Sequence, residues 1–157
     1  MVLRYRLAII ALAYSVACPS VYGGAAEYRQ LLDAHPDPAD KAAICFRFWD
    51  ISAAIFELML RDGMRERDDA TTNKGASALY QSRLRTFFIE SLGRKELVDR
   101  GYKAGAGIEL SEGLGKFGCK DAVNNLLNEQ RYEALLREAD ERAINYVKTV
   151  PFEEPRP

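Results

Sequence analysis

The residues that could carry chemistry are few, and structural roles explain most of them. His35 is the only histidine, so the chain lacks the material for a histidine metal cluster or a Ser/His/Asp triad. Asp50 and Glu57 are seven residues apart and share a helix face, as the paired acids of a glycosidase could. Each also lies three or four residues from an arginine, Arg47 or Arg61, which favours ion pairing. We therefore predict a protein that is not an enzyme, with no catalytic residues, metal site or cofactor.

A glycine-rich segment, residues 113–118 (GLGKFG), matches the letters of the GxGxxG dinucleotide fingerprint. In that fingerprint the glycines follow a β-strand and open a helix, and no strand is predicted before this segment. A P-loop is excluded because Phe117 stands where a Ser or Thr would bind magnesium. We interpret the segment as a break between two helices.

The first 23 residues read as a secretory signal. Arg4 and Arg6 precede an apolar run at 7–17, and a small-residue cleavage site, Val-Tyr-Gly, follows at 21–23. The run is shorter than the roughly 20 residues that span a bilayer. We expect cleavage after residue 23 or within the next few residues, and a periplasmic location.

The cysteines agree with this compartment. Cleavage removes Cys18 and leaves Cys45 and Cys119, an even pair that predicts one disulfide in an oxidising space. Two separate buried thiols are the alternative. Two other routes of signal processing stay open: cleavage at residues 15–17, and a lipoprotein in which Cys18 is acylated after processing. The lipoprotein is the less favoured, because Ser15 stands where a lipobox usually has leucine.

The charge balance argues against nucleic acid as a partner. The chain has 22 basic and 23 acidic residues, and removal of the signal takes two arginines and no acids. The mature chain therefore has more acidic than basic residues, whereas a protein that binds nucleic acid nonspecifically usually has a basic surface.

The rest of the chain is organised around residues 38–64, where apolar side chains fall on two helical faces. A helix with a polar stripe this narrow should be covered by other helices. Asp37 can cap its first turn and Pro38 suits its first position. The spacing predicts one central helix that runs to about Arg61 and stops near Gly63.

Around this helix the sequence predicts shorter ones, at 26–34, 76–92, 119–128 and 132–147. The glycines at 101, 105 and 107 weaken a helix over 94–114, but they can permit close approach to the central helix. No stretch alternates with period two. We therefore predict an all-α fold: one helical domain at 24–150 with about five helices around the central apolar helix, one disulfide, and a tail at 151–157.

Residues 64–75 (MRERDDATTNKG) have no apolar period and are predicted to form a long exposed loop. Because the core does not need this segment, we interpret its charged residues as contacts to a secreted protein partner. They are Arg65, Glu66, Arg67, Asp68, Asp69 and Lys74.

The layout resembles the amidase immunity proteins of bacterial type VI secretion systems. The resemblance depends on the signal, on residues 41–45 (KAAIC), on 117–121 (FGCKD), and on Tyr132, Leu135 and Leu136 beyond them. It implies a periplasmic helical inhibitor, dimeric in that family, that binds a peptidoglycan-cleaving amidase and blocks its active-site cleft with a loop. A homodimer and an amidase partner are therefore expectations that follow from the resemblance.

Two other functions stay open. A periplasmic chaperone or envelope-stress protein would use an apolar surface that becomes exposed when acids are protonated. A small-ligand carrier would hold a cavity lined by aromatic side chains of the helices, such as Trp49, Phe56, Phe87 and Phe88.

Overall fold

The computed structural model describes residues 24–150. The predicted signal peptide (1–23), Cys18 within it and the predicted tail (151–157) lie outside these residues. The described residues form eight α-helices, one short 3-10 helix and no β-strand: α1 (Ala25–Ala34), α2 (Pro38–Ile44), α3 (Phe46–Glu66), α4 (Asp69–Ser91), α5 (Lys95–Ala104), α6 (Leu110–Leu114), α7 (Cys119–Leu127), η1 (Gln130–Tyr132) and α8 (Glu133–Thr149). The all-α prediction is confirmed for this part of the chain, whereas a bundle of about five helices is not.

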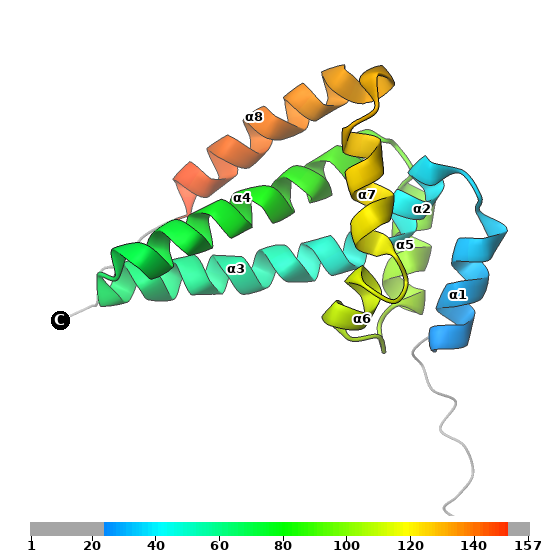
Figure 1. Ribbon diagram of the computed structural model, residues 1–157, viewed down its shortest axis with the longest axis horizontal. Helices are drawn as coiled ribbons and strands as arrows, with labels where there is room; N and C mark the ends of the chain where they lie inside the picture. Colours follow the sequence, from blue (N-terminus) through cyan, green and yellow to red (C-terminus); the bar gives the residue numbers. More distant parts are fainter. Residues whose placement is uncertain (1–23, 151–157) are drawn as a thin grey trace, which may run out of the picture.

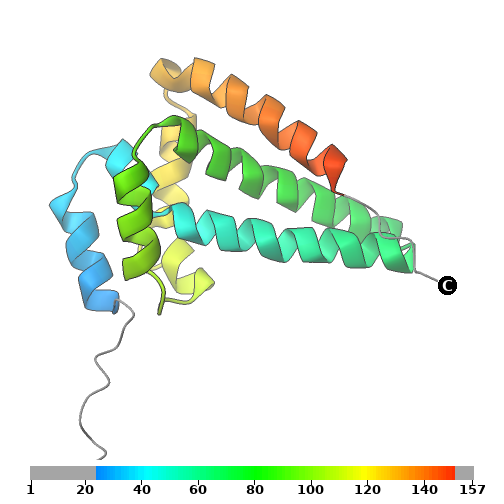
Figure 2. The ribbon, with the colours of Figure 1, turned by 180° about the vertical axis from the view of Figure 1, so that it is seen from behind.

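The helices fall into two groups. Helices α3 and α4 form a long antiparallel hairpin, and α8 lies along α4 (Figure 1). The shorter helices α1, α2, α5, α6 and α7 gather around the beginning of α3 (Figure 2). The hairpin therefore projects from a block of short helices. Among residues 24–150, no helix has both the length and the hydropathy that a membrane crossing requires.

The prediction of one continuous central helix is wrong, because Cys45 divides it into α2 and α3. The capping prediction is confirmed: Asp37 Oδ1 accepts hydrogen bonds from the backbone N–H of Ala39 (2.7 Å) and Asp40 (3.2 Å). At Cys45 the chain makes a turn and then starts a new helix in another direction (Figure 1). Helix α2 is buried among the short helices, while α3 pairs with α4.

Two glycines let the short helices approach the break closely. A Cβ atom on Gly101 of α5 would lie 2.2 Å from the carbonyl oxygen of Ile44, and one on Gly113 of α6 would lie 2.2 Å from the Phe48 ring. The expectation of close approach to the predicted central helix is therefore confirmed for Gly101. Residues 94–114 form two helices, α5 and α6, instead of one.

The apolar side chains form two buried clusters. The larger one joins the short helices to the first turns of α3 and to parts of α4 and α8. Within it, the Tyr28 ring is edge-on to the rings of Phe48 (5.6 Å) and Phe117 (5.1 Å). The smaller one lies between the hairpin and the end of α8, and its buried members are Ala53, Leu60, Leu79 and Val150. One side of α3, with Ile55 and Leu58, is exposed, contrary to the prediction that only a narrow polar stripe of this helix faces water.

Candidate functional site

The predicted loop at 64–75 is not a loop. Helix α3 continues to Glu66 and α4 begins at Asp69, so Arg67 and Asp68 alone separate them. The prediction failed because hydrophobic periodicity reports burial, and these turns extend beyond the core. We call residues 65–69 the hairpin tip; it lies at the end of the hairpin far from the short helices (Figure 1).

The turn at the tip is fixed by local bonds. Arg67 adopts the left-handed conformation (φ 57°) at the end of α3, and the N–H of Asp68 donates to the carbonyl of Gly63 (2.9 Å). Asp68 then caps α4, because its carboxylate accepts from the N–H of Ala70 (3.1 Å) and from the Thr71 hydroxyl. The hydrogen bond from the Thr71 hydroxyl is the main cause that holds the pKa of Asp68 below its ordinary value.

Close packing also stiffens the hairpin next to its tip. A Cβ on Gly63 would meet the backbone nitrogen of Thr72 at 2.7 Å, and a Cβ on Gly75 would meet the Leu60 Cα at 2.8 Å. Glycine thus lets the two helix backbones approach without an intervening side chain. The tip is a rigid helical corner.

The structure brings five of the six predicted contact residues together at this corner. Lys74, the sixth, lies farther along α4. All six are exposed, but two have structural roles: Arg65 pairs with Asp62 (2.9 Å), and Asp68 is the cap. The residues that present charge without such a role are Glu66, Arg67, Asp69 and Lys74.

The disulfide between Cys45 and Cys119 is present as predicted, with Cα atoms 5.3 Å apart. It ties the break between α2 and α3 to the start of α7, and both cysteines are fully buried. The Tyr28 hydroxyl donates to the Ile44 carbonyl (3.1 Å) and lies 3.3 Å from the Cys119 sulfur. Burial raises the pKa of Tyr28 well above its ordinary range. Sequence reasoning missed this tyrosine, although its position on the apolar side of the first helix was a signal.

Asp50 and Glu57 belong to an ion-pair network, as predicted from the arginines near them in the sequence. Arg83 of α4 contacts both acids, with Nη1 3.2 Å from Asp50 and Nη2 3.6 Å from Glu57. Glu57 also accepts from Arg61 (3.0 Å) and from the Tyr146 hydroxyl (2.6 Å). The expected pairing of Glu57 with Arg61 is therefore confirmed, whereas Asp50 pairs with Arg83 instead of Arg47.

The network sets the protonation of Glu57. Burial raises the pKa of Glu57. Hydrogen bonds from Tyr146 and Arg61, together with the positive charges of Arg61 and Arg83, lower the pKa by more than burial raises it, so the net shift is downward. A carboxylate held ionised by two arginines is a poor proton donor. The arrangement stabilises the α3, α4 and α8 layer.

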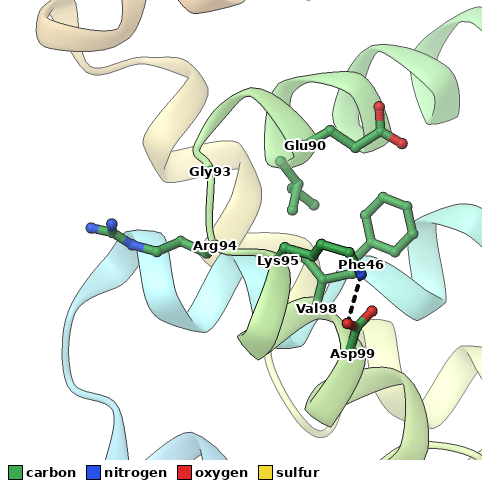
Figure 3. A pocket seen from close by; sticks show the side chains of 8 residues that line it. Phe46, Glu90, Gly93, Arg94, Lys95, Val98 and Asp99 are labelled. Carbon is green, nitrogen blue, oxygen red and sulfur yellow. Dashed lines mark hydrogen bonds and ion pairs between the residues drawn. The ribbon is translucent and has the colours of Figure 1, made fainter.

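A cleft of about 410 Å³ lies where α4 passes into α5 (Figure 3). Its apolar surface comes from Phe46, Ile89 and Val98. The charged side chains around it already have partners: Lys95 pairs with Asp99 (2.8 Å), Glu90 with Arg142 (2.6 Å) and Arg94 with Asp40 (2.9 Å). The cleft can accept an apolar group of the size of one side chain. These lining residues differ from the four aromatics predicted for a carrier.

The glycine-rich segment is the break between helices that the sequence indicated. Helix α6 ends at Leu114 and α7 begins at Cys119, and no strand precedes them in the described chain. His35 is half-buried, with Nδ1 3.7 Å from Asp40. Among residues 24–150, no group of three His, Cys, Asp or Glu side chains could hold a metal ion.

Comparisons with known proteins do not assign a family. No protein-family model, no curated protein and no solved structure matches this chain.

Proposed function

We propose that the protein is a secreted helical binding protein of the immunity type, which inhibits a peptidoglycan-cleaving enzyme by placing the hairpin tip over its active site. The observation that carries this proposal is the tip itself. It projects from the short helices, it is held rigid by a cap and close helix packing, and it presents charges that the fold does not use (Figure 1).

Rigidity favours this use of the tip. A flexible loop loses conformational entropy when it binds, roughly 0.5 to 1.5 kcal/mol for each ordered side chain. Here the backbone of the tip is already fixed by the Asp68 cap and the left-handed Arg67. A helical corner of this kind can enter a cleft with little reorganisation.

The charges define what the cleft would offer. Arg67 can pair with a carboxylate, and its planar guanidinium favours a two-point contact. Asp69 and Glu66 can accept hydrogen bonds from polar or basic groups at the cleft rim. The mixture of signs favours a polar cleft with separate acidic and basic groups, as in an enzyme that acts on a peptide-bearing sugar polymer.

The experiment compares the parent with a tip variant, Glu66→Ala, Arg67→Gly and Asp69→Ala. Asp68 is kept because it caps α4, and glycine suits the left-handed position of Arg67. The matched control changes three exposed charges of α8, Arg137, Glu138 and Glu141, to alanine. All three proteins should melt within about 0.5 kcal/mol of one another, because exposed substitutions change stability little.

The partner is isolated from periplasmic extract on immobilised parent protein, identified, and assayed for peptidoglycan hydrolysis. Parent and control should inhibit hydrolysis, while the tip variant should bind at least about tenfold more weakly, about 1.4 kcal/mol. Equal affinity of the tip variant would reject the tip as the contact. A partner whose hydrolytic activity is unchanged by the bound protein would reject inhibition.

The cleft of Figure 3 favours a second candidate, a carrier of small apolar ligands. A test that uses the cleft alone is titration with an environment-sensitive apolar dye, comparing the parent with Val98→Glu. Saturable dye binding that this variant abolishes would support the carrier. Dye binding unaffected by the variant would reject this cleft as the ligand site.

A further inference from the structure

One side of α3 carries an exposed apolar stripe. We define the α3 stripe as Ile51, Ala54, Ile55 and Leu58, which follow the three-and-four spacing of one helix face. Leu58 is 65% exposed and Ile55 is 48% exposed, the highest values among the large apolar side chains of residues 24–150. Helix α4 lies between α3 and α8 (Figure 1), so neither of these long helices covers the stripe.

The α3 stripe and the hairpin tip belong to one continuous surface. Leu58 precedes Arg65 by seven residues, or two helical turns, which is about 10 Å along the helix axis. Asp62 lies between them on the same face and pairs with Arg65 (2.9 Å), so the two charges balance each other. A partner that reaches the tip can therefore extend over the stripe without covering an unpaired charge.

The tip by itself is too small and too polar to be a whole interface. A standard specific interface buries roughly 800 Å² on each partner and involves about 20–30 residues of each. The tip has the five residues 65–69, and every one of them is charged. Interfaces usually have an apolar core inside a polar rim, and charged residues are depleted in that core. An inhibitor that binds through the tip therefore needs an apolar surface next to it.

We propose that the α3 stripe is the apolar core of the enzyme-binding surface. The enzyme lays an apolar ledge beside its active-site cleft on Ile55 and Leu58, while the hairpin tip enters the cleft. Ala54 adds no bulk beside them, so a partner segment can approach the helix closely. This inference rests on the proposed inhibition and adds to it the kind of surface that the inhibited enzyme must present.

The charges around the stripe favour a protein over a lipid surface. Helices that lie on membranes have a polar face rich in lysine and arginine, which attracts anionic lipids. On this side of α3 the exposed residues that follow the stripe include Asp62 and Glu66, both acidic. These acids would repel an anionic membrane, whereas the rim of a protein interface accommodates both signs of charge.

The first test measures affinity. The probe is the peptidoglycan-cleaving enzyme recovered by capture on the parent protein, purified and titrated with the mature chain. Leu58→Glu should weaken binding at least about tenfold, because it places a charge in an apolar contact. The matched control is Ile144→Glu on α8, where the side chain is also exposed (38%) but lies off the stripe; it should bind like the parent. Leu58→Ala, a milder change, should weaken binding in the same direction.

The second test distinguishes the stripe from the tip by the kind of contact that each makes. Burial of apolar surface gives a negative heat-capacity change on binding. Leu58→Ala should therefore reduce that change, measured by titration calorimetry at several temperatures, and leave the salt dependence of affinity as in the parent. The tip variant, Glu66→Ala, Arg67→Gly and Asp69→Ala, should reduce the salt dependence and leave the heat-capacity change nearly intact.

The two proposals fail in different ways. Parent-like affinity of a folded Leu58→Glu, with binding lost in the tip variant, would overturn the stripe and leave the proposed function standing. Parent-like affinity of the tip variant, with binding lost in Leu58→Glu, would reject the tip and support the stripe. Recovery of no peptidoglycan-cleaving enzyme would overturn both. Melting curves identify a misfolded variant, in which case Leu58→Ala replaces Leu58→Glu.

Other occupants of the stripe are tested on the chain without enzyme. The readouts are sedimentation over a concentration series and flotation with vesicles of phosphatidylethanolamine and phosphatidylglycerol. Self-association or vesicle binding that Leu58→Glu abolishes, together with unchanged affinity for the enzyme, would assign the stripe to a second copy or to lipid and overturn the proposal.

Discussion

Replacement of Gly101 by alanine should destabilise the protein, although alanine is the better helix former. In an exposed helix interior this change would gain about 1 kcal/mol. Here the new Cβ would lie 2.2 Å from the Ile44 carbonyl oxygen and 2.6 Å from its Cα, both backbone atoms. Since ordinary contacts begin near 3.5 Å, α5 would have to move by about 1 Å relative to α2.

Overpacking of this kind costs about 1 to 3 kcal/mol, and more when backbone must move. Because the Gly101 contacts are to backbone atoms, we take about 3 kcal/mol for the overpacking, and subtraction of the helix-propensity gain of about 1 kcal/mol leaves a net loss of about 2 kcal/mol. For a domain of this size that loss lowers the melting temperature by roughly 7 °C. Urea unfolding followed by helical circular dichroism should show a lower midpoint with an unchanged slope.

The control is Gly24→Ala, because a Cβ at Gly24 meets nothing within 4 Å. That variant should stay within about 0.5 kcal/mol of the parent. A Gly101→Ala protein as stable as the parent, or more stable, would refute the close approach of α5 to α2.

Three further predictions concern the core, the disulfide and the ion-pair network. Replacing Cys45 and Cys119 by alanine should cost about 4 kcal/mol by the chain-entropy model, since the bond closes a separation of 74 residues. Two titratable thiols in the native parent, or a double variant that melts at the temperature of the parent, would contradict this. Trp49→Ala should cost about 3 to 5 kcal/mol, because the ring is 8% exposed and Arg85 lies over it at 4.7 Å; parent-like melting would show that the site can collapse or that the face is exposed. Glu57 has a lowered pKa in the folded state, so its contribution to stability is full above the pKa of a free glutamate, about 4.3, and is lost as the pH falls through the folded-state pKa. Acid unfolding of Glu57→Gln should therefore depend less on pH below about 4.3 than that of the parent, and identical pH profiles would contradict the network's role.

Local sequence signals determined several elements of this protein. The helices at 26–34 and 119–128 were predicted close to their observed bounds, and the Asp37 cap was predicted from residue type alone. The Cys45–Cys119 bond followed from an even count in an expected oxidising compartment. These features depend on residue type and spacing, which the sequence displays directly.

Other features depended on which surfaces meet in the folded chain. The three-and-four spacing runs through α2 and α3 without interruption, so periodicity could not reveal a break that lies at the disulfide and beside Gly101. At 64–75 the helices continue beyond the core, where no apolar side chain is needed and periodicity therefore disappears.

The exposed apolar side chains of α3 also show what periodicity cannot predict, here because a core-like pattern is not covered. Ile55 and Leu58 have the spacing of core residues, yet no described helix covers them. Spacing determines that two side chains share a helix face. Only the tertiary structure decides whether another element lies against that face, because burial depends on contacts between segments that are far apart in the sequence.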